Sequence, residues 1–508
     1  MQRRRYRRDG IDHPRAGRDT VVAIGIGSLM EGRRRGRPSF FLVGEYMTSH
    51  QTDFTAASVR RNILELAVPM TMAQLINLLY NMVDRMYIGR IPETGSIALT
   101  SLGLCFPIIM VVSAFANLFG TGGAPLCSIE SGRGNREEAE RIVGTSFTML
   151  LICGLALTVL GIACIQPLLR IFGASDATYP FARQYAVIYL SGNIFVMIGF
   201  GMNGFINCQG FGRTGMMTVL LGAVTNIILD PIFIFALGMG VRGAALATVI
   251  SQALSALWVL KFLTGRKATI RLKTKNFGIQ RSRLHKIVAL GFSGFVMSAT
   301  NSVVQIVCNA NLQLYGGDLY VGVMTILSSI REILTMPVQG LTNGAMPVLG
   351  FNYGAKAYGR VRQAIRFTSI CCIAYTFVAW IILISFPQVF IRIFNDSPTL
   401  IEAGIPAIEL YFFGFFMMAL QFSGQTVFQS LGKARQAIFF SLFRKIVIVV
   451  PLTILLPRLS NLGVDGVFLA EPISNFVGGA ACFSTMLLTV LPELRRRQVS
   501  SADKTKKT

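Results

Sequence analysis

Histidine, tryptophan and charged residues are scarce in this sequence. Of its 508 residues, three are histidine and two are tryptophan, and only 14% are charged, whereas about a quarter of an average soluble domain is charged. Hydrophobic residues account for 52% of the sequence, and the mean hydropathy is +0.56. So few charges cannot cover a soluble globule of this size, and the composition also excludes a disordered chain or a coiled coil. The sequence therefore predicts an integral membrane protein.

Motifs for catalysis, nucleotide binding and structural metals are also missing. The sequence contains no G-x-x-x-x-G-K-[ST] loop, and its nine cysteines form no C-x-x-C pair, so neither an ATP site of that type nor a zinc site is indicated. One G-x-G-x-x-G pattern spans residues 199–204, but it lies inside an apolar run, where close helix packing explains it better than a dinucleotide. We expect no enzyme, no cofactor and no metal other than a coupling ion.

Apolar runs fill the sequence from residue 62 onward, and each is long enough to cross a bilayer, which takes about 20 residues. Eight runs contain no Asp, Glu, Lys or Arg, and four contain a few charged residues. The twelve runs are 62–89, 97–129, 143–169, 184–212, 214–241, 243–260, 287–317, 319–355, 367–391, 410–432, 436–457 and 472–492. This pattern predicts an all-α integral membrane fold with twelve transmembrane helices.

Positive charge is distributed unevenly between the two sides of the predicted membrane. The loops on one side carry 19 lysine and arginine residues and those on the other side carry six, so by the positive-inside rule both termini lie in the cytoplasm. Residues 265–286 then form a basic cytoplasmic linker, and residues 493–508 form a basic cytoplasmic tail. The net charge of +24 is explained by membrane orientation and does not indicate a nucleic-acid partner.

The N-terminal residues 1–58 differ in composition from the rest of the chain. Residues 1–46 hold eleven arginines and five acidic residues. Such a segment cannot bury a core, so we expect a basic, disordered cytoplasmic extension, with Met47 as an alternative translation start. The other interpretation is a tail that contacts anionic lipid.

The sequence repeats itself at a constant offset of 222 residues. The matched positions are Pro125 with Pro347, Gly132 with Gly354, Arg170-Ile171-Phe172 with Arg392-Ile393-Phe394, Tyr189 with Tyr411, Gly192 with Gly414, and Gly210 with Gly432. Each half, 59–264 and 287–492, holds six predicted spans, so the two halves share one orientation and are related by a parallel pseudo-two-fold axis. Parallel repeats of this kind occur in secondary transporters, which bind substrate between two lobes.

Ionisable groups inside apolar runs are candidates for function, because burying a charge in hydrocarbon costs several kcal/mol. In the first half, Asp84 and Asp230 lie at depths close to that of Thr248, counted at about 1.5 Å per residue. Asn226 lies four residues before Asp230, on the same helix face. Two carboxylates with amide and hydroxyl oxygens can carry a proton or bind Na⁺. The alternative is that Asp84 anchors the interface beside Arg85 and that Asp230 only marks a helix break.

Pro69 lies in the same apolar run as Asp84. Proline breaks the backbone hydrogen-bond ladder of a helix, which membrane proteins tolerate where neighbours satisfy the freed carbonyl. A helix bend at Pro69 coupled to protonation of Asp84 is one hypothesis, and a fixed kink is the other.

Charged residues of the second half form a different set. Glu332 and Arg444 fall at matched depths near the middle of the membrane, Arg331 adjoins Glu332, and Glu471 opens the last span near the outer face. Glu332 and Glu471 could bind a cationic substrate or carry a second proton. Equally, Glu332 could form a structural ion pair with Arg331 or Arg444, which would lower the cost of burying both.

These motifs resemble those of MATE, the multidrug and toxic compound extrusion family, over roughly residues 58–490. The resemblance rests on Pro69, Gln74 and Val83-Asp84 in the first span, on Gly344-Ala345-Met346-Pro347 and Asn352-Tyr353-Gly354-Ala355 in the eighth, and on the segments 226–231 and 240–248. Arg444 with Pro451, together with the segment 470–474, is similar to the MepA-like bacterial branch.

The resemblance implies two six-helix lobes that export cationic or amphipathic organic compounds against H⁺ or Na⁺. It also implies a cation site in the first lobe made of Asp84, Asn226, Asp230 and Thr248, with Tyr185 of the fourth span. The run 287–317 lacks the acidic residue that some relatives carry there, which argues against a second ion site of that kind.

We therefore predict a secondary active multidrug efflux transporter of the prokaryotic plasma membrane that works by alternating access of two lobes. A flippase for a lipid-linked precursor is the alternative, and it would need a strongly cationic central cavity. The expected partners are small organic cations or amphipathic drugs and membrane lipid, with no nucleic acid and no obligatory protein partner.

Overall fold

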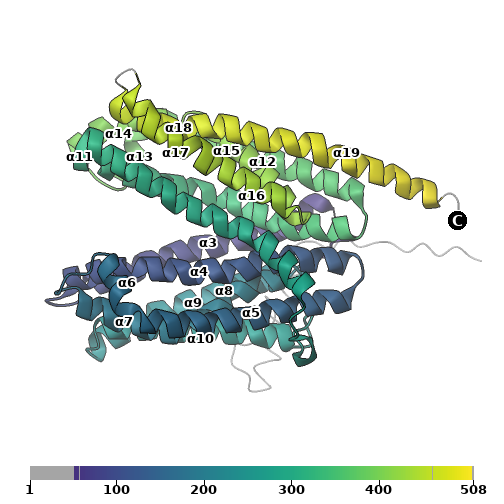
Figure 1. The fold of residues 1–508 in the computed structure, drawn as a ribbon, viewed down its shortest axis with the longest axis horizontal. Helices are drawn as coiled ribbons and strands as arrows, with labels where there is room; N and C mark the ends of the chain where they lie inside the picture. Colours follow the sequence, from purple (N-terminus) through teal and green to yellow (C-terminus); the bar gives the residue numbers. More distant parts are fainter. Residues whose placement is uncertain (1–50, 57, 460–461, 506–508) are drawn as a thin grey trace, which may run out of the picture. The chain divides into compact units, whose positions relative to one another are not determined.

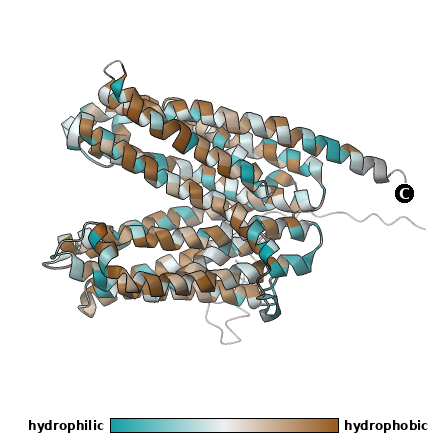
Figure 2. Cartoon of the chain, in the orientation of Figure 1, coloured by the Kyte–Doolittle hydropathy of each residue, from teal (hydrophilic) through white to brown (hydrophobic). Residues whose placement is uncertain are grey.

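The computed structural model describes residues 51–56, 58–459 and 462–505, with side chains as far as residue 500. The extension expected at residues 1–50, including Met47, lies outside the described residues. The described part is almost entirely helical, and no strand occurs in it. Figure 1 shows the helices gathered into two bundles, and Figure 2 shows hydrophobic residues dominating the middle portions of the helices.

The first bundle corresponds to the predicted first half. Its helices are α3 (Val59–Gly89), α4 (Gly95–Gly132), α5 (Arg136–Ala163), the short α6 (Ile165–Ile171), α7 (Tyr179–Ser191), α8 (Asn193–Asn207), α9 (Gly212–Pro231) with the π-helix η1 (Ile232–Ala236), and α10 (Val241–Thr264). The linker that follows contains one 3₁₀ turn, η2 (Thr274–Asn276).

The second bundle follows the linker and reaches the end of the described chain. Its helices are α11 (Arg281–Gly354), α12 (Tyr358–Ser385), the short α13 (Pro387–Arg392), α14 (Pro398–Tyr411), η3 (Phe415–Met417), α15 (Met418–Ser430), α16 (Ala434–Leu442), η4 (Phe443–Val449), α17 (Val450–Leu455), η5 (Leu456–Arg458), α18 (Gly463–Ser474), η6 (Asn475–Gly479) and α19 (Ala480–Thr505). The predicted basic tail is therefore a helical continuation of the last span as far as it is described.

The twelve predicted spans can be counted along the described helices. Nine helices are long and apolar enough to cross a membrane, and two bent pairs, α7 with α8 (56°) and α14 with α15 (45°), raise the number to 11. α11 counts twice, because its 74 residues would measure about 111 Å as a single helix against a hydrocarbon core of about 30 Å. Its backbone leaves the helical region at Gly317 (φ 67°, ψ −166°). The described chain thus holds twelve spans, and Gly317 lies at the predicted boundary between the seventh and the eighth.

Three predicted spans begin nine or more residues too late in the sequence. The ninth begins at Tyr358 rather than at residue 367, the tenth at Pro398 rather than at residue 410, and the twelfth at Gly463 rather than at residue 472. The sequence criterion ended each run at charged residues. In α14 the acidic residues, including Glu409, are exposed, whereas in α18 the carboxylate of Glu471 is buried among cations.

The internal repeat is visible in the backbone. Gly210 (φ 89°) and Gly432 (φ 73°) both adopt positive φ, a conformation that glycine reaches without steric cost. The two bent spans break at Gly192 and Gly414, and the short helices α6 and α13 begin at residues 165 and 387. Each of these pairs is 222 residues apart, so the two lobes share one topology.

Glycines bring the two lobes into close contact. A Cβ atom on Gly132 of α4 would collide with the carbonyl oxygen of Phe351 in α11, and one on Gly354 would collide with that of Ile129. The two contacts are repeat mates, because Ile129 and Phe351 are also 222 residues apart. Helix backbones approach this closely only where a side chain is absent. The contacts lie at the end of the bundles that carries the linker, which we call the linker end.

Residues 51–56 connect the two bundles at the linker end. The backbone N–H of Thr52 donates to the carbonyl oxygen of Gly210 in the first bundle (3.1 Å). Phe54 packs against Phe351 of the second bundle, with ring centroids 5.2 Å apart, and its carbonyl oxygen accepts from Arg360 Nη2 (2.8 Å). The described part of the stretch 1–58 is therefore packed against both lobes.

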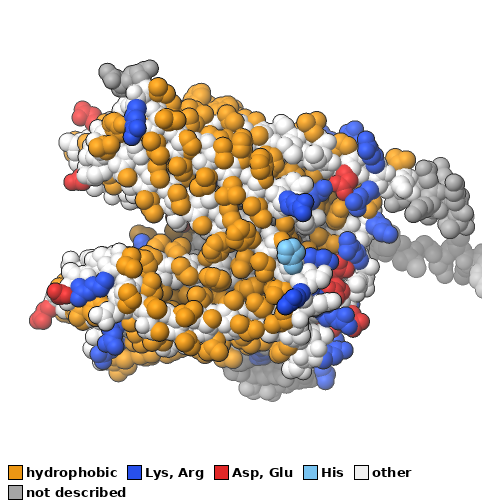
Figure 3. Space-filling view, in the orientation of Figure 1, with side chains coloured by type: hydrophobic (Ala, Val, Ile, Leu, Met, Phe, Trp, Pro, Cys, Tyr) orange, Lys and Arg blue, Asp and Glu red, His pale blue; other side chains and the backbone are white. Residues whose placement is uncertain are grey.

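The linker is fastened to the first bundle by ion pairs. Arg283 donates from Nε and Nη2 to the two carboxylate oxygens of Glu138 (2.8 and 2.9 Å). Lys273 Nζ donates to Glu140 Oε2 (2.7 Å). Figure 3 shows lysine and arginine side chains concentrated at this end of the molecule.

Replacing Gly132 by alanine tests the contact between the lobes. The added Cβ would meet a backbone carbonyl, which cannot move aside as a flexible side chain can, so we expect a loss of about 1–3 kcal/mol of stability. Gly103→Ala on the same helix is the control, because a Cβ there meets nothing within 4 Å and alanine is the better helix former. Thermal unfolding in detergent measures both variants, and equal melting temperatures would contradict the close contact.

Candidate functional site

Four helices of the first bundle converge on a cluster of buried polar side chains. α3 supplies Asp84, α9 supplies Asn226 and Asp230, α10 supplies Thr248, and α7 supplies Tyr185. Their exposed fractions lie between 0% and 7%. The structure thus brings together all five residues predicted for cation coupling, and we call this cluster the first-lobe site.

Hydrogen bonds link the members of the first-lobe site. Asn226 Nδ2 donates to Asp230 Oδ1 (3.3 Å) and makes a longer contact with Thr248 Oγ1 (3.5 Å). Thr248 Oγ1 donates in turn to the carbonyl oxygen of Ala244 (3.0 Å). The carboxyl groups of Asp84 and Asp230 are hydrogen-bond partners. Because ionised carboxylates only accept hydrogen bonds, such a pair requires a proton or a cation between its oxygens.

Several oxygen atoms of the first-lobe site lack a donor. Asp84 Oδ1, Asp230 Oδ2 and Asn226 Oδ1 are buried and have no hydrogen-bond partner. Each buried acceptor without a donor costs roughly 1–3 kcal/mol of folding stability. A proton or a hard cation would satisfy these oxygens. Carboxylate and amide oxygens suit a hard cation such as Na⁺. For a transition metal, the described residues offer no group of three His, Cys, Asp or Glu side chains.

The alternative explanation of Asp84 as an interface anchor does not fit its surroundings. Asp84 is only 7% exposed and contacts Asp230, whereas Arg85 is exposed and lies over the ring of Phe106, 5.8 Å from its centroid. Asp230 does precede a change of helix type, because α9 continues at residue 232 as the π-helix η1. Asp230 therefore precedes a change of helix type, as that alternative expects, and also has a buried carboxyl group.

Tyr80 belongs to the first-lobe site and was missed by the sequence analysis. Its side chain is a hydrogen-bond partner of Thr248, as is that of Tyr185. The available signal was its spacing, because Tyr80 precedes Asp84 by four residues and so shares its face of α3. α3 itself continues through Pro69, so the bend coupled to protonation stays a prediction.

A cavity of about 450 Å³ lies between the two bundles, lined by α3, α4, α8, α9 and α10 of the first and by the second half of α11. Its described lining residues include no charged side chain. Eight amides contribute to the lining: Gln74, Asn77, Asn117, Asn203, Asn207, Gln252, Gln339 and Asn343. Tyr80 also lines the cavity, so one side chain contacts both the cavity and the first-lobe site.

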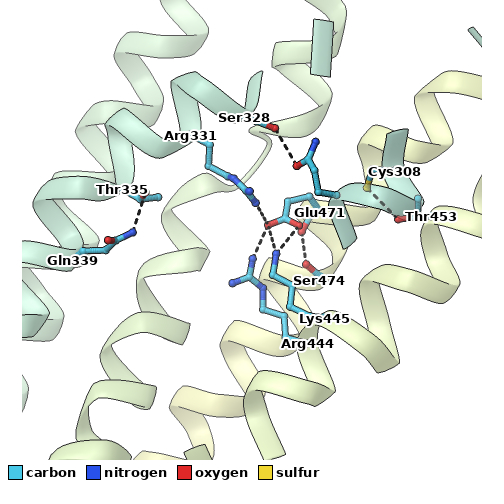
Figure 4. Close-up of polar contacts among 11 residues, drawn as sticks. Cys308, Ser328, Arg331, Thr335, Gln339, Arg444, Lys445, Thr453, Glu471 and Ser474 are labelled. Atoms are coloured by element: carbon cyan, nitrogen blue, oxygen red, sulfur yellow. Dashed lines mark hydrogen bonds and ion pairs between the residues drawn. The ribbon is translucent and has the colours of Figure 1, made fainter. Parts of the chain in front are cut away.

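Charged side chains of the second bundle surround Glu471 of α18 (Figure 4). Its Oε1 accepts from Arg444 Nη2 at 2.6 Å and from Arg331 Nη1 and Lys445 Nζ at 3.4 Å, and Lys445 Nζ also lies 3.4 Å from Oε2. The side chains of Glu471, Arg444 and Lys445 are 6–8% exposed and that of Arg331 is 25% exposed. We call these four residues the second-lobe cluster.

The alternative that Glu332 forms an ion pair with Arg331 or Arg444 is wrong. Glu332 is exposed, and in the described part of the chain no cation pairs with it. Successive side chains on a helix diverge by about 100°, so Arg331 reaches the bundle interior while its neighbour does not. Glu471 takes the role expected of Glu332, because α18 begins at Gly463 and places Glu471 deeper than the sequence indicated. Lys445 was missed, although it lies inside an apolar run beside Arg444.

The chain is similar to known transporters over most of its length. The multidrug export protein MepA of Staphylococcus haemolyticus is 24% identical over 427 residues, which cover 84% of this chain and 93% of that protein. An FAD transporter of Shewanella oneidensis is 24% identical over 439 residues, covering 84% of this chain and 94% of its own.

Solved structures share the fold. A MATE crystal structure in complex with MaD3S matches with a TM-score of 0.82 and 23% identity, covering 88% of this chain and 100% of its own. A MOP superfamily transporter from Pyrococcus furiosus matches with a TM-score of 0.80 and 23% identity, covering 89% and 99% of the two chains, and its description reports a binding pocket of reverse polarity that suggests a different function.

The family assignment follows from the sequence itself. The sequence model of the MatE family matches residues 69–232 and 295–455, which lie in the first and the second lobe and together make up more than half of the chain. The match includes Asp84, Tyr185, Asn226 and Asp230 of the first-lobe site, and Thr248 lies outside it. The two lobes with their twelve described spans have the architecture of the MATE structures, and the chain belongs to the MatE family.

Proposed function

We propose that this protein is a secondary active multidrug efflux transporter, which exports cationic or amphipathic organic compounds in exchange for H⁺ or Na⁺ bound at the first-lobe site. The observation that carries the proposal is a buried carboxyl pair with unpaired oxygens beside a large uncharged cavity, joined to it through Tyr80. The similarity to proteins named multidrug export protein MepA supports the same function.

Coupling requires that the ion favours one arrangement of the lobes over the other. A proton or Na⁺ on Asp84 and Asp230 satisfies the unpaired oxygens and holds α3 against α9. When the ion leaves, two carboxylates remain in hydrocarbon and need new donors, and the hydroxyl group of Tyr80 is close enough to become one. Because Tyr80 lines the cavity, its movement would change the space that the substrate occupies.

The lining of the cavity indicates the class of substrate. Amide side chains donate and accept hydrogen bonds without imposing a charge, and the remaining lining residues are largely apolar. Such a surface suits organic cations with delocalised charge and neutral amphipathic drugs. A flippase for a pyrophosphate-linked lipid would need cationic groups there, and the described lining has none.

The distribution of basic residues indicates how the protein is oriented in the membrane. We place the linker end in the cytoplasm of a prokaryotic plasma membrane, because the basic loops gather there. The lobes contact each other through Gly132 and Gly354 at this end, so the described arrangement closes the cytoplasmic side of the cavity.

Replacement of Asp230 by asparagine tests the coupling site. The amide keeps the shape of the side chain but cannot take up the proton or supply the charge, so we expect gradient-driven ethidium uptake into everted vesicles, in which export runs inward, to fall by at least about tenfold. Asp176→Asn is the control, since that carboxylate is 94% exposed. Normal uptake in Asp230→Asn would contradict the site. The gradient that drives wild-type uptake, ΔpH or Na⁺, identifies the ion.

Replacement of Tyr80 by phenylalanine tests the connection between the site and the cavity. Loss of the hydroxyl removes the hydrogen bond to Thr248, worth about 0.5–1.5 kcal/mol, while the ring remains in the cavity wall. We expect unchanged ethidium affinity and roughly threefold to tenfold slower efflux. Tyr87→Phe on the same helix is the control, because its ring packs against Phe235. If both variants transport equally, Tyr80 has no part in coupling.

A further inference from the structure

The second-lobe cluster contains more positive than negative charge. Arg331, Arg444 and Lys445 meet a single carboxylate, that of Glu471, in the described part of the chain. Cys308 and Tyr411, which line the space beside them, are neutral when protonated. With all three cations charged, the cluster has a surplus of two positive charges. Such a surplus inside a membrane domain costs several kcal/mol unless an anion offsets it.

The hydrogen-bond donors of the cluster are also in surplus. Only Arg444 makes a short bond to Glu471 (2.6 Å), and both Arg331 and Lys445 remain at 3.4 Å. An ammonium group has three N–H donors and a guanidinium group has five, so one carboxylate cannot satisfy them. Arg444 Nε is buried and has no hydrogen-bond partner, but Arg444 does not line the space between Arg331 and Lys445. The long contacts of Arg331 and Lys445 are the ones that point to a missing acceptor there.

A small cavity lies where that acceptor would fit. It measures about 10 Å³ and is lined by Arg331, Lys445 and Glu471 together with Tyr411, Asn301 and Gln305. This volume is about the smallest that holds one water-sized particle. A halide ion is somewhat larger, so the flexible side chains of Arg331 and Lys445 would move apart slightly to admit it. A carboxylate or phosphate group of a substrate is much larger than the cavity, and a water molecule there would leave the charge surplus uncompensated.

We propose that the second-lobe cluster binds a monovalent anion of halide size, held by Arg331 and Lys445 in this cavity. The anion lowers the surplus of positive charge in the cluster from two to one. It accepts hydrogen bonds from the N–H groups that Glu471 leaves unused. It joins α11, η4 and α18, so it stabilises the packing of the second lobe. The site does not depend on the proposed export function and can be tested without transport.

Thermal unfolding of the purified full-length protein in detergent measures the binding. Sodium gluconate is replaced stepwise by chloride or bromide at constant ionic strength, and gluconate is too large for the cavity. A ligand that binds only the folded state raises the melting temperature with its concentration, so we expect a saturable rise of several degrees. If chloride and gluconate give the wild-type protein the same melting temperature, the proposal is overturned. An uncharged Lys445 would give that result.

Two substitutions in the cluster should act in opposite directions. Lys445→Met removes one cation and should weaken the chloride response at least tenfold in concentration, whereas Glu471→Gln removes the competing carboxylate and should strengthen it. Lys433→Met is the matched control, because this lysine pairs with Glu493 outside the cluster (2.6 Å). An unchanged chloride response in Lys445→Met would overturn the assignment.

A direct observation keeps the proposal testable if a variant fails to fold. Wild-type crystals grown with bromide should show an anomalous peak between Arg331 and Lys445. Absence of that peak at saturating bromide would overturn the site. Stabilisation by benzoate but not by chloride would also overturn it, since the ligand would then be the carboxylate of an organic substrate.

Discussion

Every polar group inside the hydrocarbon region must find its partner within the protein, because lipid offers none. The two lobes meet this constraint differently. In the first lobe, the adjoining carboxyl groups of Asp84 and Asp230 leave buried oxygens without donors. In the second lobe, Glu471 is surrounded by cations, and positive charge exceeds negative charge among the described residues. The two lobes therefore have unmet requirements of opposite polarity, and the two proposed ligands, a cation and an anion, correspond to them.

The repeat explains why such different sites sit in similar scaffolds. Gly192 and Gly414 break corresponding spans, and Gly132 and Gly354 make reciprocal contacts at the linker end. These positions give the two lobes corresponding backbones, whereas the polar side chains of the two sites differ. The close contacts are made by backbone atoms, and beside them Val59, Ile63 and Leu66 of α3 pack in one hydrophobic cluster with second-lobe residues. Separation of the lobes at the linker end would therefore break both the backbone contacts and this cluster.

The sequence predicted that the residues of the first-lobe site lie together, because the signals for their proximity are local or depend on depth alone. Asn226 and Asp230 share a helix face through their spacing, and counting residues placed Asp84 and Thr248 at similar depths. The second-lobe cluster was predicted less well, because there the direction of each side chain decides which residues meet. Glu332 lies on the exposed face of its helix, whereas the adjacent Arg331 reaches Glu471. A count of residues along the span gives both nearly the same depth and cannot distinguish them. Helix rotation is set by tertiary packing, which a single sequence does not reveal.

The two cavities lie in different parts of the molecule. The large cavity is lined mainly by the first bundle and adjoins the first-lobe site through Tyr80, whereas the small cavity of the second-lobe cluster is lined by second-bundle residues alone. In the proposed mechanism, a change of charge at Asp84 and Asp230 would act through Tyr80 on the wall of the large cavity. A change at Glu471 would act on the packing of α11 and α18, and the only described second-bundle residues in that wall, Gln339, Asn343, Met346 and Pro347, belong to α11.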